Sequence, residues 1–123
     1  ELLPVRKPRP KVRDRYLEYT IYIARDKTTL IHQRKGNDIW KHLWEFVCAE
    51  RTGEEAIRRK AKGENILELT HVLSHQKLHA RFVIKNVSEL PKIPDTVVVS
   101  LNDLDNYAFS RLTLKALSSL ALT

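Results

Sequence analysis

Alternating hydrophobic and polar residues predict a strand near the start of the chain. Residues 16–23 place one apolar set on a single face, formed by Leu17, Tyr19, Ile21 and Ile23. A period of two in β-branched and aromatic residues is typical of a half-buried strand. Residues 28–33 resume this pattern after a polar break, so we expect a second strand that pairs with the first as a hairpin.

The same period of two recurs further along, on either side of a polar turn. One face of the first half carries Leu67, Leu69, His71 and Leu73, and one face of the second half carries Leu78, Ala80, Phe82 and Ile84. This pattern predicts a β-hairpin that turns over residues 74–77. Residues 96–100 contain three consecutive valines and are interpreted as a further, buried strand.

One helix is predicted in the middle of the chain. Thr52 is a candidate N-cap, and Glu55 stands where its capping-box partner is expected. Residues 53–62 then change from acidic to basic, as the helix dipole prefers, and Gly63 ends the helix.

A second helix is predicted at the end of the chain. After Asn102, apolar residues recur at helical spacings, with an interruption expected near Ser110. Residues 39–46 are rich in aromatic side chains but show no clear period, so both a short helix and a buried loop stay open there. The order of elements predicts an α+β fold, with a mixed or antiparallel sheet and helices packed on it.

Composition places these elements in one globular domain. The chain has 123 residues, 42% hydrophobic and 30% charged, which excludes a disordered chain. The longest uncharged stretch, residues 116–123, is too short to span a bilayer, so no membrane partner is expected. Cys48 is the single cysteine and fits a reducing compartment. The chain begins at Glu1 and contains no methionine, so we expect a domain excised from a longer protein.

The charge is strongly positive and unevenly distributed. The net charge is +7 with a pI near 9.7, which favours a polyanionic partner, nucleic acid first. Residues 1–15 hold six basic residues among three prolines, which forbid a helix there. We interpret this segment as a connector, and a solvated linker and a phosphate-binding arm are both compatible with it. The folded domain is then expected over residues 16–123.

Two groups of side chains could suggest catalysis or metal binding, and neither is favoured. His71, His75 and His79 are spaced by four, but the segment is predicted as two strands around a turn, which destroys the helical zinc-binding geometry. Cys48 has an apolar neighbourhood without an adjacent base, so a buried thiol is favoured over a nucleophile. No metal site is predicted.

The expected topology resembles the Nudix hydrolases, which bind a divalent metal through a glutamate-rich helix. The family motif needs a glycine followed six residues later by glutamate, with further glutamates on the helix. Six residues after Gly36, Gly53 and Gly63 stand His42, Arg59 and Leu69. Residues 58–62 are basic instead of acidic and suit a phosphate better than a metal. The sequence therefore predicts a Nudix-like fold without Nudix catalysis.

Three segments resemble the C-terminal domain of the MutY family of adenine DNA glycosylases, which act on adenine opposite 8-oxoguanine. Residues 38–46 are similar to the family's Leu-Trp-Glu-Phe-Pro stretch, residues 70–75 to its Phe-Ser-His loop, and residues 104–112 to its Tyr-Ala-(Leu/Phe)-Pro ending. The sequence departs from the family where Leu73 replaces the usual phenylalanine and where Val47 and Ser110 replace prolines. The resemblance extends over nearly the whole chain and implies a MutT-like, Nudix-related fold.

The resemblance also implies a function and a set of site residues. The loop formed by Leu73, Ser74 and His75 would read 8-oxoguanine. The positive charge, and not the resemblance, gives the candidates for phosphate contacts, and for the basic helix a merely solvated face stays open as the alternative; the candidates are Arg6, Lys7, Arg9, Lys11, Arg58, Arg59 and Lys62. The partners would be duplex DNA containing 8-oxoguanine opposite adenine and the parent protein's N-terminal catalytic domain. A bacterial, cytoplasmic and nucleoid-associated location is expected.

Catalysis is expected to lie outside this chain. In the family, the adenine pocket, the catalytic carboxylates and a four-cysteine 4Fe–4S cluster belong to the N-terminal domain, so the present chain is predicted to be non-catalytic and without a cofactor. Two alternatives stay open, a degenerate Nudix-type nucleotide hydrolase and a basic protein-interaction module. The absence of a carboxylate helix disfavours the first, and the segments shared with MutY disfavour the second.

Overall fold

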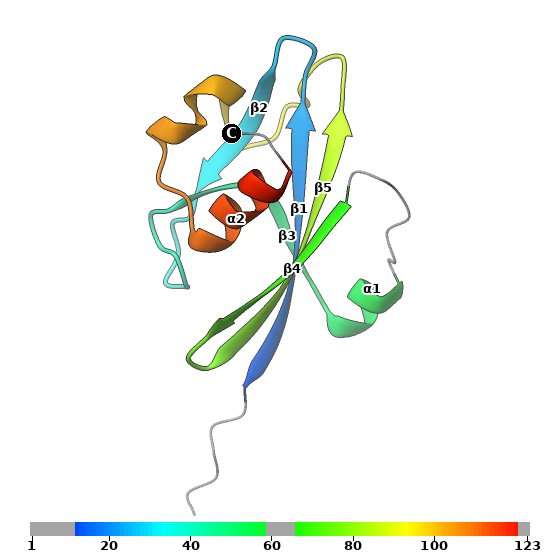
Figure 1. Ribbon diagram of the computed structural model, residues 1–123, viewed down its shortest axis with the longest axis vertical. Helices are drawn as coiled ribbons and strands as arrows, with labels where there is room; N and C mark the ends of the chain where they lie inside the picture. The colour runs from blue at the N-terminus through cyan, green and yellow to red at the C-terminus, as the bar shows by residue number, and fades with distance from the viewer. Residues whose placement is uncertain (1–11, 59–65, 121–123) are drawn as a thin grey trace, which may run out of the picture.

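In the described part of the chain, six strands form a single mixed sheet in the order β4-β5-β1-β3-β2-β6 (Figure 1). The structure, a computed structural model, describes residues 12–58 and 66–120. Its elements are β1 (Arg13–Ile23), β2 (Thr28–Gln33), β3 (Trp44–Arg51), α1 (Gly53–Arg58), β4 (Ile66–Leu73), β5 (Gln76–Asn86), β6 (Val97–Ser100), the 3₁₀ helix η1 (Leu101–Asn106) and α2 (Arg111–Ser119). β1 and β5 run parallel, and the other neighbouring strands are antiparallel.

The central strand β1 shows the predicted alternation, and its apolar face forms the middle of the core. Leu17, Tyr19 and Ile21 are buried, and the Tyr19 ring stacks on Phe82 of β5 with the ring centroids 4.6 Å apart. The predicted hairpin faces are also confirmed, because Leu78, Ala80 and Phe82 of β5 are buried. Such stacked aromatic pairs stabilise a core beyond the area that they bury.

The two α-helices lie on opposite sides of β1. Helix α2 crosses one face of the sheet (Figure 1) and adds Leu112, Ala116 and Leu117 to the core. Its start confirms the predicted interruption, because the Ser110 hydroxyl caps the helix by accepting from the Thr113 N–H at 3.2 Å. Helix α1 lies against the other face.

The bare backbone of Gly53 permits the close approach of α1 to the sheet. A Cβ atom at this position would lie 3.3 Å from the ring of Tyr16 on β1. Only the first part of the predicted helix 53–62 can be compared with the structure, because residues 59–65 lie outside the described part of the chain.

The predicted pairing of the first two strands is wrong. β3 lies between them, with residues 47–51 paired to β1 and residues 44–46 paired to β2. Residues 39–43 form a loop, as one of the two predictions has it, although this loop is partly exposed. A strand occupies the rest of the segment, because β3 begins at Trp44. Glu45 and Phe46 are adjacent and both buried, so the alternation of polar and apolar residues does not report burial in this strand.

The valine-rich strand β6 is also not buried as predicted. It is an edge strand, in which Val97 and Val98 are 41% and 58% exposed and only Val99 is buried. Three consecutive valines suit an edge strand and a central strand equally well, since side chains alternate between the two faces in both cases.

Candidate nucleic-acid interface

The predicted recognition loop is the tip of a tight hairpin. β4 and β5 are joined by the two residues Ser74 and His75, both exposed, with Leu73 paired to Gln76. The turn is shorter than predicted, because Gln76 and Lys77 already belong to β5. Figure 1 shows this hairpin projecting from the body of the sheet, beside the start of β1.

The three residues predicted to read the lesion lie together but face different surroundings. Ser74 and His75 are exposed, whereas Leu73 is partly buried and packs against the edge of the core. The His75 carbonyl accepts a hydrogen bond from the Arg13 N–H at 3.0 Å, which ties the tip to the first residue of β1. The exposed polar surface of the tip therefore comes from Ser74 and His75.

The hairpin separates the three histidines, as predicted. The His71 ring lies 5.9 Å from the ring of Trp40, and the His79 ring stacks on Tyr16 at 4.7 Å. His79 Nε2 is also 2.9 Å from a carboxylate oxygen of Asp14. Within the two described ranges, no group of three or more His, Cys, Asp or Glu side chains is placed to hold a metal ion.

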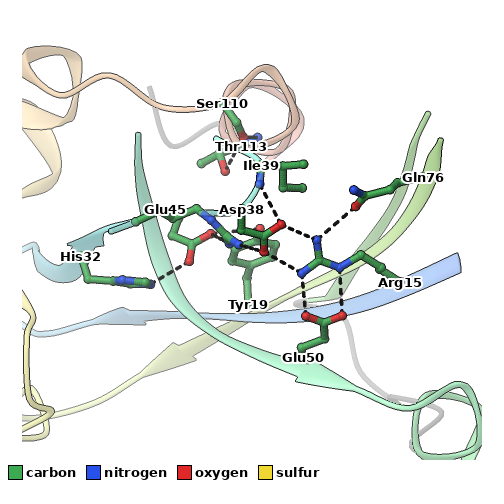
Figure 2. Close-up of polar contacts among 11 residues, drawn as sticks. Arg15, Tyr19, His32, Asp38, Ile39, Glu45, Glu50, Gln76, Ser110 and Thr113 are labelled. Carbon is green, nitrogen blue, oxygen red and sulfur yellow. Dashed lines mark hydrogen bonds and ion pairs between the residues drawn. The ribbon is translucent and has the colours of Figure 1, made fainter. Parts of the chain in front are cut away.

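Beside the tip of the hairpin, one buried arginine connects three segments of the chain. Arg15 is 6% exposed, and all five of its N–H groups are used (Figure 2). Two bonds reach Glu50 of β3 at 2.7 and 2.9 Å, and two reach Asp38 at 2.9 Å each. The fifth reaches the side-chain oxygen of Gln76, the first residue of β5, at 3.1 Å.

A second arginine extends this network toward β2. Arg34 donates to Asp38 at 3.0 Å and to Glu45 at 2.9 Å. Glu45, which is 3% exposed, also accepts from the hydroxyl of buried Tyr19 at 3.2 Å and lies 2.8 Å from His32 Nε2. The contacts thus run from Glu50 through Arg15, Asp38 and Arg34 to Glu45. Figure 2 shows Arg15 between Glu50 and Asp38 in this chain.

The signal for this network in the sequence is a single charged residue in register with an apolar strand face. Arg15 falls on the same strand face as Leu17, Tyr19 and Ile21, directly before them in the period of two. A charge at a core-facing position must be paired, because an isolated buried charge is costly. Two partners, Asp38 and Glu50, are 23 and 35 residues away, so their identity could not be read from local spacing.

The ion pairs and burial around this network shift the pKa values of several of its groups and of the nearby Cys48 thiol. Hydrogen bonds from Arg15 hold the pKa of the Asp38 and Glu50 carboxyls below their usual values, and the same hydrogen bonds, with the carboxylate charges adding to them, raise the pKa of Arg15. Burial raises the pKa of the Cys48 thiol to about 12, with the Glu45 carboxylate adding to the effect. The prediction of an unreactive thiol agrees with this environment.

The lowered pKa values of the Asp38 and Glu50 carboxyls predict a loss of stability in acid. The folded state holds both carboxylates ionised more strongly than the unfolded chain does, so their stabilisation is complete above about pH 5 and decreases as the pH falls below about 4. We expect Asp38→Asn to flatten the acid limb of the unfolding free energy, measured by urea denaturation between about pH 6 and pH 2. The exposed residue Glu89, changed to Gln, is the matched control. Equal slopes in Asp38→Asn and wild type would contradict the role of the Arg15 pair.

Most of the predicted phosphate contacts cannot be placed. Arg6, Lys7, Arg9, Lys11, Arg59 and Lys62 lie outside the described residues, and Arg58 is described only as the last residue of α1. These contacts stay predictions. Of the helices in the described part of the chain, none is long and apolar enough to cross a membrane.

Comparison with protein families places the fold. Residues 19–119 match the NUDIX domain family. The chain belongs to this family. No curated protein sequence matches the chain significantly. The predicted Nudix-like α+β fold is therefore confirmed for this NUDIX domain, although α1 carries acidic residues only in its first turn, at Glu54 and Glu55.

Several solved structures share the fold of this NUDIX domain at low sequence identity. The C-terminal domain of mouse MUTYH, solved in complex with human PCNA, has a TM-score of 0.61 at 15% identity, covering 86% of each chain. The Escherichia coli ORF135 protein has a TM-score of 0.56 at 16% identity, covering 89% of this chain and 92% of its own. MutT, studied in Aliivibrio salmonicida and Vibrio cholerae, has a TM-score of 0.53 at 15% identity, covering 90% and 100%. Similarity at this level shows the fold alone, and MutY-type domains are one of several possibilities within it.

Two of the three segments that resemble MutY pack on each other in this NUDIX domain. The Trp44 N–H donates to the Ala108 carbonyl at 2.8 Å, and the Trp44 ring meets Tyr107 edge-on at 5.1 Å. Phe46 stacks on Phe109 at 5.9 Å. These two segments therefore build the core, and the third, at residues 70–75, is the one that ends on an exposed surface.

Proposed function

We propose that this domain binds duplex DNA and recognises 8-oxoguanine opposite adenine, as the lesion-recognition part of an adenine DNA glycosylase in base-excision repair. The observation that carries the proposal is the exposed Ser74-His75 tip, presented at the end of the β4–β5 hairpin. The resemblance of residues 70–75 to the MutY loop and the fold shared with the mouse MUTYH domain support it. The net charge of +7 suits a DNA partner.

The chemistry of the lesion matches a hydroxyl on a hairpin tip. Guanine offers an acceptor at N7 in the major groove, whereas 8-oxoguanine carries a proton there and a new oxygen at C8. A reader must accept a hydrogen bond from N7 and donate to the C8 oxygen. The Ser74 hydroxyl can accept the first bond, and backbone N–H groups of the turn can approach the oxygen.

Two arginines hold the tip and the residue beside it, which favours discrimination between 8-oxoguanine and guanine. Arg13 donates its N–H to the His75 carbonyl, and Arg15 donates to the side chain of Gln76. A reading group fixed in this way loses little conformational entropy on binding. His75 is placed beside Ser74 and would support the loop or contact a phosphate.

Base excision itself is assigned to the parent protein's N-terminal domain, together with the adenine pocket, the catalytic carboxylates and the 4Fe–4S cluster. The present domain would supply lesion recognition to that domain. Its basic N-terminal segment and the cluster Arg58, Arg59 and Lys62 would contact phosphates. A bacterial cytoplasm is the proposed location.

Replacing Ser74 by alanine should reduce lesion preference without unfolding the domain. One hydrogen bond to a base edge contributes roughly 1–3 kcal/mol of discrimination, so the preference should fall by a factor of about 5 to 150. The measurement is the ratio of dissociation constants for duplexes containing guanine or 8-oxoguanine opposite adenine. Ser88→Ala is the matched control, because Ser88 is exposed and lies beyond the opposite end of β5.

The same preparation separates the alternatives. An unchanged lesion preference in Ser74→Ala would overturn the assignment of this residue, and absence of any preference in the wild-type domain would overturn the proposed function. Magnesium-dependent turnover of 8-oxo-dGTP that a chelator abolishes would instead support a Nudix-type hydrolase.

A further inference from the structure

The loop between β2 and β3, residues 34–43 and here called the Trp40 loop, has an unusual backbone. Trp40 and His42 adopt φ values of 57° and 72°, in the left-handed region that L-residues with large side chains rarely enter. Such a conformation persists only where the surroundings hold the residue in place.

Hydrogen bonds hold the Trp40 loop in this conformation. The Arg34 N–H donates to the Leu43 carbonyl at 2.9 Å, and the His42 N–H donates to the Arg34 carbonyl at 2.8 Å. The Leu43 N–H donates to the Trp40 carbonyl at 3.0 Å, and the Gln33 side chain donates to the His42 carbonyl at 3.0 Å. The loop is thus closed at its base by hydrogen bonds among residues 33, 34, 40, 42 and 43.

The Trp40 loop is also anchored to the β4–β5 hairpin. Asp38 of the loop and Gln76 of the hairpin share the same arginine, Arg15 (Figure 2). The Trp40 ring lies 5.9 Å from His71 on β4. The hairpin tip and this loop are therefore held in a defined relative position.

Around the Trp40 loop and the hairpin tip, the positive charges outnumber the free negative charges. Its carboxylates are engaged: Asp38 and Glu50 pair with arginines, and Asp14 lies against His79. Lys35 and Lys41 of the loop are exposed and form no salt bridge among the described residues. Lys41 has one weak contact, 3.4 Å from Nζ to the Asn37 side-chain oxygen, which a phosphate can replace.

We propose that the Trp40 loop is a second DNA-contacting element, in which Lys35 and Lys41 bind backbone phosphates next to the base that the hairpin reads. The proposal rests on the proposed function, because it assumes that the hairpin end of the domain faces DNA. Lysine acts at such a site as a point charge that positions the duplex and carries no sequence information. The Arg15 network would set the distance between the phosphate-binding and lesion-reading elements.

Salt dependence tests the loop separately from lesion reading. Each phosphate contact that is lost reduces the slope of log affinity against log salt by about one. We expect the single variant Lys41→Gln to reduce this slope by about one. The double variant, Lys35→Gln combined with Lys41→Gln, should reduce it by about two. Affinity for duplexes with guanine and with 8-oxoguanine should fall by the same factor, so the lesion preference stays at its wild-type value.

The control variant is Lys92→Gln, which removes the same charge from an exposed lysine near the β6 edge of the sheet, away from the hairpin. It should leave the slope unchanged. An unchanged slope in Lys41→Gln, or an equal reduction in Lys92→Gln, would overturn the inference, as would a wild-type domain that binds no duplex at low salt. A domain without lesion preference but with the expected slopes would overturn the proposed function and keep the loop as a DNA contact.

Discussion

Replacing Arg15 by methionine should destabilise the domain by about 3 kcal/mol. The variant keeps most of the aliphatic stem but leaves Asp38 and Glu50 close together without their shared cation. Breaking a buried ion pair from one side typically costs about 3–5 kcal/mol. The two carboxylates are 39% and 41% exposed, so water recovers part of the loss and the lower end of that range is expected. Urea unfolding at neutral pH measures the change.

Companion variants identify the cause of this loss. Arg15→Lys keeps the charge but cannot reproduce five hydrogen bonds, so an intermediate loss is expected. Combining Arg15→Met with Asp38→Asn and Glu50→Gln removes the uncompensated charges and should recover part of the stability. A loss below about 1 kcal/mol in Arg15→Met, or no recovery in the triple variant, would show that the network contributes little.

If the hairpin reads 8-oxoguanine as proposed, the contact between Arg15 and Gln76 should also affect the ratio of dissociation constants for duplexes with guanine and with 8-oxoguanine, beyond its effect on stability. Gln76→Met removes the bond between Arg15 and the hairpin while both carboxylate pairs stay in place. The structure therefore offers a way to separate the position of the tip from the folding of the domain. Gln76→Glu, which restores an acceptor for Arg15, is the matching rescue.

Local patterns predicted the elements that local forces determine. The face of β1, the two faces of the β4–β5 hairpin and the break at Ser110 follow from periodicity and capping, and the structure confirms them. The position of β3 between β1 and β2 does not, because strand order depends on contacts between distant segments. Glu45 and Phe46 are adjacent and both buried, so this strand lacks the alternation by which a strand is recognised. Glu45 is buried with an arginine partner, whereas Phe46 packs on an aromatic ring.

The candidate site shows the same division. The tip could be predicted, as a turn over residues 74–77 that is two residues too long, because a short contiguous segment carries it. The anchoring network was missed because Arg15 and its partner Gln76 are 61 residues apart. A charged residue in register with the apolar face of a strand is the signal that would have revealed it.

Removing the Glu45 carboxylate should be the most damaging single change in the polar network. In Glu45→Ala, Arg34 loses its 2.9 Å partner, and the hydroxyl of Tyr19, a residue that is 0% exposed, loses its 3.2 Å acceptor. Burial alone would lower the pKa of Arg34, but the Glu45 carboxylate outweighs this effect and raises it. Loss of that partner should therefore cost about 3–5 kcal/mol of unfolding free energy.

Two comparisons make the Glu45 result specific. Glu45→Gln keeps an acceptor for Tyr19 and should cost less than Glu45→Ala, whereas Glu89→Ala removes an exposed carboxylate and should change stability by less than about 0.5 kcal/mol. Combining Glu45→Leu with Arg34→Met removes both charges and should be less harmful than Glu45→Ala. If Glu45→Ala cost no more than Glu89→Ala, the Trp44-Glu45-Phe46 segment would owe its place in the domain to aromatic packing alone. The expected loss would instead give Glu45 a structural role. It fixes Arg34, which in turn holds Asp38 of the Trp40 loop beside the β4–β5 hairpin.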